Sequence, residues 1–326
     1  MIIVLIVASS YGCATIMGFA GMGRDDHSSS SVVDACSAGG PEKVLNRWGE
    51  ISGSLIVRII DSTGAFDSGV IQLGSPDGVA VALNELYILD GVNRVILKFD
   101  PNSQMVRKRI KLPGLNARSV IHVDRSLSLY VANAGAPTVR QYDVDGRLIQ
   151  TFGQPAELTD PVGLAVNDRT GNVFVADGLT SRILVFNLQG AVSQVIGSEI
   201  DGVRFSSIRD IALAPDQLFV VDGLSKEVHL LSRAGGYRYS FGAEDLLSPR
   251  TVVVDDHNRV FVADEGDNTI KVFRGGELLS VIGADDDEDR IHFIRISDMW
   301  QSEGMVYVAD SGSVSIKIFR VIAPCA

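Results

Sequence analysis

A six-fold repeat constrains the fold of this chain more than any other feature. A short apolar segment recurs as LYILD ending at Asp90, LYVAN at Asn133, VFVAD at Asp177, LFVVD at Asp222, VFVAD at Asp264 and VYVAD at Asp310. Successive copies are spaced by 43, 44, 45, 42 and 46 residues. Repeats of this length with short apolar runs between Gly, Asn and Asp are typical of β-propeller blades, whereas helical repeats show apolar residues about 3.6 positions apart. The six copies therefore predict an all-β, six-bladed β-propeller.

The segment Pro161–Phe186 shows how one repeat divides into strands. It contains PVGLAV, NVFVAD and RILVF, which are separated by a polar turn at Asn167–Gly171 and by Gly178–Ser181. Short apolar runs bounded by Gly, Asn and Asp are typical of strands joined by hairpin turns. Each repeat therefore supplies three consecutive strands.

A fourth, outer strand ending in Gly is expected before each following repeat. Its copies are Val70–Gly74, Leu148–Gly153, Ser193–Gly197, Arg238–Gly242 and Leu279–Gly283. The first copy has no repeat before it, and the last repeat ends after SIKIFRV without an outer strand. We therefore expect the N-terminal strand at Val70–Gly74 to complete the C-terminal blade, which closes the ring and removes open sheet edges. The stretch Ser54–Asp61 is left over and can add a further edge strand.

The repeats are variations on three motifs in order: P-x-G-V-A-V, then L-Y-V-A-D, then N-x-R-I-x-V-F. In the first copy they are Pro76–Val81, Tyr87–Asp90 and Asn93–Phe99. This pattern resembles the NHL repeat over residues 70–320, which implies a six-bladed propeller. The family includes protein-binding and RNA-binding modules, a metal-dependent amidating lyase and many exported bacterial proteins. Function therefore has to be argued from the site and not from the fold.

The first residues indicate export. Residues 1–12, MIIVLIVASSYG, are too short to span a bilayer alone but fit the apolar core of a secretory signal. The stretch Ser10-Tyr11-Gly12-Cys13 resembles a bacterial lipoprotein signal, in which a small residue precedes a lipidated Cys. This resemblance implies a lipid anchor at Cys13 and a location at the outer membrane, in the periplasm or on the cell surface. A cleaved secretory signal and an uncleaved anchor over residues 1–22 are the alternatives.

The composition changes after this signal. Residues 24–45 are rich in Ser, Gly and charge with little to bury, which is typical of a flexible tether, and with the anchor at Cys13 they make up the segment 13–45. We assign residues 46–326 to one propeller domain. A chain of this length often forms two domains, but a ring of repeats can form one domain of the same length.

Three cysteines permit one disulfide. If Cys13 carries lipid, Cys36 and Cys325 are the remaining pair, and an exported protein allows them to oxidise. Such a bond would close nearly the whole domain as one loop, worth about 4–5 kcal/mol in the chain-entropy model. Two unpaired thiols are the alternative.

The charge balance excludes one class of partner. With 29 Lys and Arg against 40 Asp and Glu, the net charge is −11, whereas binding a phosphate backbone requires a basic footprint. Nucleic acid is therefore not expected. The run Asp285–Asp289 holds five adjacent carboxylates but lacks the alternate spacing and Gly turn of a calcium loop. We expect a solvated loop there, with a weak cation site as the alternative.

The Asp at the end of each second strand is expected to be structural. The residues concerned are Asp90, Asp177, Asp222, Asp264 and Asp310, with Asn133 in the same place. Each precedes a turn, where such side chains accept backbone N–H bonds in Asx turns. A carboxylate repeated in every blade indicates scaffold, because a single site requires asymmetry.

Asymmetry is expected where the inner strands begin. One aligned position holds Asp77, Arg118, Val162, Arg209, Arg250 and Ser297, and the next holds Gly78, Ser119, Gly163, Asp210, Thr251 and Asp298. Inner strands line the channel, so these residues ring its mouth. The cluster of Arg118, Arg209 and Arg250 would suit a carboxylate or phosphate. The alternative is a structural ring in which these arginines pair with Asp77, Asp210 and Asp298.

Known catalytic patterns are not found in the sequence. A catalytic zinc requires three converging ligands, whereas the histidines fall at different heights of the blades. His122 occupies a row filled elsewhere by Val81, Val166 and Val254, and is expected to be a packed residue with a bonded ring nitrogen. No phosphate loop, nucleophile elbow or Cys redox pair is present in the sequence.

These observations leave two functions. The first is a non-catalytic, lipid-anchored binding propeller that presents one face to a protein or peptide partner, contacts the membrane only through its anchor and needs no cofactor. The second is a lyase or hydrolase that uses the charged channel mouth, with calcium or zinc as the metal to be tested. Stoichiometric metal in the purified protein would favour the second.

Overall fold

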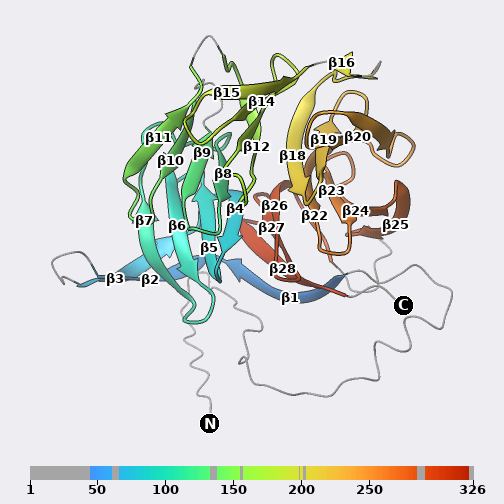
Figure 1. The fold of residues 1–326 in the computed structure, drawn as a ribbon. Coiled ribbons are helices and arrows are strands. Elements are labelled where there is room, and N and C mark those ends of the chain that lie inside the picture. Colours follow the sequence, from blue (N-terminus) through green and yellow to red (C-terminus); the bar gives the residue numbers. More distant parts are fainter. Residues whose placement is uncertain are drawn as a thin grey trace.

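The strands form a ring of small antiparallel sheets around a central channel (Figure 1). The computed structural model describes residues 45–60, 66–132, 138–154, 157–197, 199–200, 203–284 and 291–322, and within these ranges it contains strands and no helix. It thus offers no helix there that could cross a membrane. Six sheets act as blades, which confirms the predicted six-bladed β-propeller.

Each blade has four main strands, ordered from the channel outward. Blade one contains β4 (Pro76–Ala82), β5 (Glu85–Asp90), β6 (Val95–Asp100) and β7 (Met105–Ile110), and blade two contains β8 (Val120–Val123), β9 (Leu129–Ala132), β10 (Val139–Tyr142) and β11 (Leu148–Phe152). Blade three contains β12 (Pro161–Val166), β13 (Val173–Asp177), β14 (Arg182–Phe186) and β15 (Val192–Ile196), and blade four contains β18 (Ile208–Ala214), β19 (Gln217–Asp222), β20 (Glu227–Ser232) and β21 (Tyr237–Phe241). Blade five contains β22 (Pro249–Val254), β23 (Arg259–Asp264), β24 (Thr269–Arg274) and β25 (Glu277–Ile282), and blade six contains β26 (Ile296–Ser302), β27 (Met305–Asp310), β28 (Ser315–Val321) and β1 (Leu45–Ser52). A small hairpin, β16 (Glu199–Ile200) and β17 (Val203–Arg204), precedes blade four.

The ring closes through an N-terminal strand, as expected, but the predicted strand was wrong. β1 pairs antiparallel with β28, from Leu45 opposite Val321 to Ser52 opposite Ser315. The predicted closing segment, Val70–Gly74, falls mostly within β3 (Phe66–Gln72), which forms a hairpin with β2 (Ser54–Ile60). β2 in turn pairs in parallel with β7, so this hairpin extends blade one. The leftover stretch therefore adds a strand to a sheet, but it lies between β7 and β3 and is not the edge strand that the sequence allowed.

The core lies between neighbouring blades. The Phe that ends the third strand of a blade meets an aromatic ring contributed from just before that blade, with centroids 6.0 Å apart for Phe186 and Phe152 and 5.1 Å apart for Phe273 and Phe241. Such ring pairs contribute beyond their buried area. In blades three and five the Phe of the third motif therefore joins the blade to the one before it.

Candidate functional site

The six predicted site residues lie together at one end of the channel. Arg118, Arg209, Arg250, Asp77, Asp210 and Asp298 line a cavity of about 200 Å³, with Ala117, Ser119, Val120, Val162, Thr251 and Ser297. They come from the loop before β8 and from the first residues of the other five inner strands. Because every inner strand starts at this end, residues that are far apart in the sequence converge there.

Two of the aspartates join neighbouring blades. Asp298 on β26 accepts the backbone N–H of Val79 on β4 at 2.9 Å. Asp210 on β18 accepts the backbone N–H of Val252 at 3.0 Å and the hydroxyl of Thr251 at 2.7 Å, both on β22. Each also accepts the N–H of the residue that follows it. These carboxyl groups therefore hold inner strands together while facing the cavity.

The third aspartate is bonded within its own blade. Asp77 accepts the hydroxyl of Ser75 at 3.0 Å and the N–H of Gly91 at 3.2 Å. Among the described residues, none of the three aspartates forms an ion pair with Arg118, Arg209 or Arg250. The structure thus differs from the alternative of an Arg–Asp ring, because backbone and hydroxyl donors already occupy the carboxylate oxygens.

The three arginines are in three different states. Arg118 is exposed and lies 3.4 Å from Asp160. Arg250 pairs with Glu265 at 2.7 Å and donates from Nε to the carbonyl of Ser297 at 3.0 Å. Arg209 is exposed and makes no hydrogen bond or ion pair with the residues that the structure describes. One guanidinium at the mouth is therefore open.

The residue after the Asp of the second strand explains this difference. In blade four that residue is Gly223, and a Cβ built on it would lie 2.7 Å from Nε of Arg209. In blade five the same place is filled by Glu265, whose carboxylate binds Arg250. The arginine thus lies over a bare backbone in one blade and against a carboxylate in the next.

The carboxyl groups at the mouth have raised pKa values. Burial raises the pKa of Asp298 to about 8, with the charge of Asp210 acting in the same direction and Arg250 against it. Burial also raises the pKa of Asp210 to about 6, although the bonds from Thr251 and Val252 oppose the shift. The pKa of Asp77 is raised by burial as well. Burial therefore holds the pKa of all three carboxyl groups at the mouth above its usual range.

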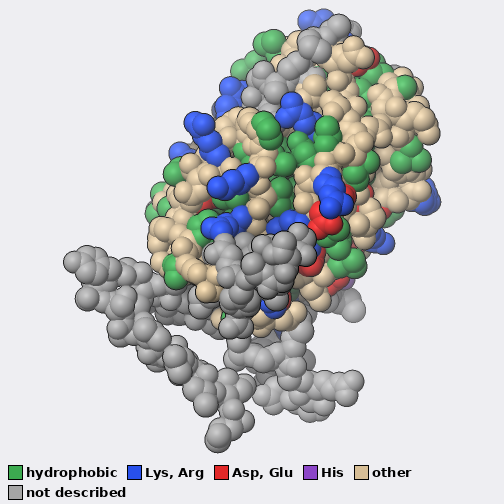
Figure 2. All heavy atoms as spheres, turned by 90° about the vertical axis from the view of Figure 1, so that its left-hand side faces the viewer, with side chains coloured by type: hydrophobic (Ala, Val, Ile, Leu, Met, Phe, Trp, Pro, Cys, Tyr) green, Lys and Arg blue, Asp and Glu red, His purple; other side chains and the backbone are tan. Residues whose placement is uncertain are grey.

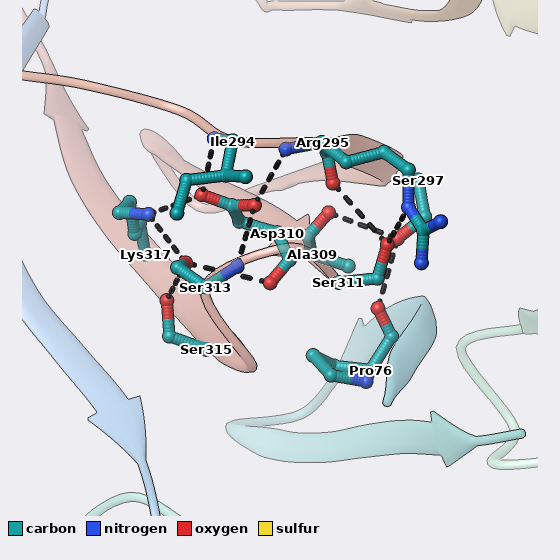
Figure 3. A network of polar contacts seen from close by, with 10 residues as sticks. All are labelled: Pro76, Ile294, Arg295, Ser297, Ala309, Asp310, Ser311, Ser313, Ser315 and Lys317. Atoms are coloured by element: carbon teal, nitrogen blue, oxygen red, sulfur yellow. Dashed lines mark hydrogen bonds and ion pairs between the residues drawn. The ribbon is translucent and has the colours of Figure 1, made fainter. Parts of the chain in front are cut away.

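The repeated aspartates of the second strands are structural, which confirms that prediction. Asp310 accepts the N–H groups of Ile294 and Arg295 before the first strand of its blade, at 3.1 and 2.9 Å, and that of Ser313 in the following turn at 3.2 Å (Figure 3). It also binds the ammonium of Lys317. Four others bind the same two backbone segments of their own blades: Asp90, Asp177, Asp222 and Asp264.

The channel below the cavity is occupied by rings. His122 on β8 meets Trp300 on β26 edge to face, with centroids 4.7 Å apart. Burial lowers the pKa of His122 to about 4, and its ring bonds the backbone of Leu164. This is the packed histidine with a bonded nitrogen that the sequence predicted, whereas the approach of Trp300 across the channel had no sequence signal.

An apolar rim around the mouth was not predicted from the sequence. We give this name to five exposed side chains: Val92 (67%), Leu179 (74%), Leu224 (71%), Leu247 (51%) and Ile294 (62%). They lie in turns between second and third strands or just before first strands, and both places are at the mouth end of a blade. The signal was present in the sequence as an apolar residue that follows Asp-Gly in three repeats.

Three predicted features lie outside the described residues: the lipidation at Cys13, the Cys36–Cys325 disulfide and the acidic run Asp285–Asp289. In the part that is described, no three His, Cys, Asp or Glu side chains are grouped so that they could hold a metal ion.

Comparison with known proteins shows the fold. No protein-family model matches this chain, and no curated protein matches it. Among solved structures it is similar to virginiamycin B lyase from Staphylococcus aureus, crystallised in its selenomethionine form, with a TM-score of 0.58 and 13% identity. The match covers 77% of this chain and 96% of the lyase chain. At this identity the likeness extends to the propeller fold alone.

Proposed function

We propose that this chain is a non-catalytic binding propeller that holds a protein or peptide partner on its channel-mouth face, with an anionic group of the partner seated between Arg118, Arg209 and Arg250. The observation that carries the proposal is Arg209, which lines the cavity without a hydrogen bond or ion pair to the described residues. A guanidinium offers planar donors that match a carboxylate or phosphate bidentately. An open cation at a cavity supports binding, because a scaffold role would require a partner within the fold.

The size of the cavity supports a single anionic group as its occupant. Its volume of about 200 Å³ is below the roughly 300–1,000 Å³ of pockets that enclose drug-sized ligands. One acidic side chain or a chain-terminal carboxylate fits this space. The remainder of such a partner would lie outside, over the apolar rim.

The apolar rim supports a protein or peptide as the partner. Single exposed leucines are ordinary on protein surfaces, but large apolar side chains gathered at one face mark interaction sites. Here five of them lie at the end of the blades that holds the charged cavity. A partner that covers the rim would remove them from water and would also shield the arginine–anion bond, which strengthens it.

A second candidate is a lyase or hydrolase at the same cavity. It is favoured by Asp210 and Asp298, because two carboxyl groups with pKa values of about 6 and about 8 could serve as base and acid at neutral pH. The lyase activity named for the similar structure belongs to that protein. Metal analysis of the purified chain separates the candidates: stoichiometric zinc or calcium favours the enzyme, and a metal-free protein that binds peptides favours the binding propeller.

We also propose that the chain is an exported NHL-type lipoprotein anchored through Cys13. The recurring motifs support the repeat family, and the apolar stretch before Cys13 supports the anchor. Both proposals agree with a binding module held on a membrane by a tether.

The binding proposal can be tested with defined peptides. Fluorescein-labelled nonapeptides that place one Glu, or a free C-terminal carboxylate, beside leucines are titrated with the protein and followed by anisotropy. The tightest peptide should lose about 5- to 150-fold in affinity with Arg209→Ala, since a charge-assisted bond is worth about 1–3 kcal/mol. Arg238→Ala, an exposed arginine on the outer strand β21, is the control and should leave affinity unchanged. Equal affinity of Arg209→Ala and wild type would rule out the proposed site.

A further inference from the structure

Strand β7 of blade one, which carries the β2–β3 hairpin, and the neighbouring part of blade two gather positive charge that the channel mouth does not involve. Its cations are Arg107, Lys108 and Arg109 on β7, Lys111 just after it, and Arg140 and Arg147 beside or on β10. We call this set the basic edge. It belongs to a chain whose net charge is −11. Figure 2 views this side of the molecule and shows Lys and Arg side chains around exposed hydrophobic ones.

Contacts between the two blades tie part of the basic edge together. The ammonium of Lys108 donates to the carbonyl of Val144 at 3.2 Å and pairs with Asp145 at 3.0 Å, across from blade one to blade two. Arg140 donates to the carbonyl of Pro113 at 3.4 Å in the opposite direction. These bonds hold β7 against the turn between β10 and β11.

The acidic residues on this surface are already engaged. Asp100 pairs with Arg107 at 3.0 Å, and Asp145 pairs with Lys108. Asp143 accepts the N–H groups of Asp145 and Arg147 at 2.9 and 2.8 Å, which closes the turn. None of these three acids binds the side chain of Lys111 or Arg147, so positive charge remains at these two positions.

Two of the cations extend into solvent. Lys111 and Arg147 are exposed, and neither side chain forms a hydrogen bond or ion pair with any described residue. They are therefore available to an external anionic surface.

Exposed apolar side chains lie among these cations. Leu148 and Ile149 on β11 are 57% and 54% exposed, and Val144 in the preceding turn is 43% exposed. Val144 and Leu148 thus lie on either side of the exposed Arg147 in the chain.

We propose that the basic edge docks on the surface of a membrane that contains anionic lipids. Lipid headgroups would take the cations, while Leu148 and Ile149 would enter the interface beside them, as in other peripheral membrane surfaces. A nucleic acid would use the charges but leave the apolar side chains in water. The cations are spread along an edge and are absent from the cavity lining, so a broad anionic plane matches them better than one discrete ligand.

The test is co-sedimentation of the full chain with vesicles of phosphatidylcholine alone and of phosphatidylcholine with phosphatidylglycerol. The N-terminal segment is the same in every variant. Binding to the neutral vesicles measures what this segment contributes to vesicle binding. We expect stronger binding to the anionic vesicles that weakens as salt is added. We call the gain in affinity from neutral to anionic vesicles the anionic increment. In the variant Lys111→Glu/Arg147→Glu this increment should fall by roughly 25-fold or more, since each cation contributes about five-fold.

Arg238→Glu is the control for one such charge reversal, at an exposed position on the outer strand of blade four, whereas the double variant makes two. It should retain most of the increment, and circular dichroism should show that all variants are folded. Leu148→Asn should weaken anionic-vesicle binding without changing its salt dependence. Equal binding to the two kinds of vesicle, or equal losses for the double variant and Arg238→Glu, would overturn the proposal. Binding to soluble polyglutamate without any anionic increment on vesicles would overturn it in favour of an acidic protein partner.

Discussion

At the residue scale, the position after the second-strand Asp determines whether the arginine at the mouth is open or bound. Gly223 leaves Arg209 without a carboxylate, and Glu265 supplies one to Arg250 at 2.7 Å. The two blades are built alike in this region, so the difference can be exchanged by single substitutions.

Gly223→Glu should bind Arg209 as Glu265 binds Arg250. Gly223 is not in the left-handed region of backbone conformation, and the atoms that its new Cβ would meet belong to the flexible side chain of Arg209. The fold should therefore accept the change. Affinity for the carboxylate peptide should fall several-fold, because the new ion pair competes for the guanidinium. Anisotropy titration measures this effect.

Glu265→Gly makes the reciprocal change and should tighten the same peptide by releasing Arg250. Opposite shifts for the two variants would support a mouth in which free arginine is the binding element. Shifts in the same direction would contradict it.

Asp298 gives the protein a distinctive dependence of stability on pH. Its pKa is about 8 in the folded protein and about 3.9 in an unfolded chain. A carboxyl group whose folded pKa is raised contributes stability that is fully present below its unfolded pKa and is lost as pH rises through its folded pKa. Asp210, with a folded pKa of about 6, acts in the same direction. These two groups should therefore make the free energy of unfolding decline between about pH 4 and about pH 8.

Asp298→Asn should flatten this decline, although it lowers stability at about pH 4 because an amide nitrogen cannot accept an N–H bond. Urea unfolding at several pH values measures both effects. Asp222 and Asp310 have pKa values lowered to about 2, so they make the free energy of unfolding rise with pH below about pH 4. The variant and the wild type should therefore be compared above about pH 4. An unchanged slope in the variant would show that Asp298 is not the titrating group.

At the scale of elements, β1 holds the ring closed. It pairs with β28 along its length, and Leu45 and Ile51 are buried at 3% and 2% exposure. Removing residues 1–52 should lower the melting temperature and promote aggregation, because the edge of β28 would be left unpaired. Removing residues 1–44 keeps β1 and serves as the control. Equal melting temperatures for the two truncations would contradict closure by β1.

The sequence predicted the strands of this fold better than their partners. The repeat placed the blades and the convergence of Arg118, Arg209 and Arg250, because equivalent positions of a ring must face one channel. It could not choose between β1 and β3 as the closing strand, since an outer strand with alternating apolar residues fits any sheet edge. The structure pairs β3 locally with β2 in a hairpin, and β1 has a bulge between Arg47 and Gly49 that weakens its strand pattern. The hydrogen-bond partners of the site side chains could not be predicted from the sequence either, because the donors to Asp210 and Asp298 include groups of neighbouring blades.

At the scale of the whole molecule, the propeller has one charged mouth and one basic side, and the proposed anchor would hold both near a membrane. If Cys13 is acylated, the mature chain should begin there and partition into detergent, since a triacylated cysteine far exceeds the marginal hold of a single acyl chain. Cys13→Ser should release the chain from membranes. Intact mass spectrometry that places the mature N-terminus elsewhere, or finds Cys13 unmodified, would rule out the anchor.

The central claim is that the charged mouth is a binding site and not a part of the scaffold. The free energy of unfolding of Arg209→Ala tests this claim without knowledge of the partner. As a structural comparison, Lys271→Ala removes a buried cation that lies 2.6 Å from Asp264 and 2.7 Å from Asp267, and it should cost about 3–5 kcal/mol. We predict that Arg209→Ala changes the free energy of unfolding by less than about 0.5 kcal/mol, as surface substitutions do. A loss above about 1.5 kcal/mol would show that Arg209 supports the fold, and it would contradict a binding role for the mouth.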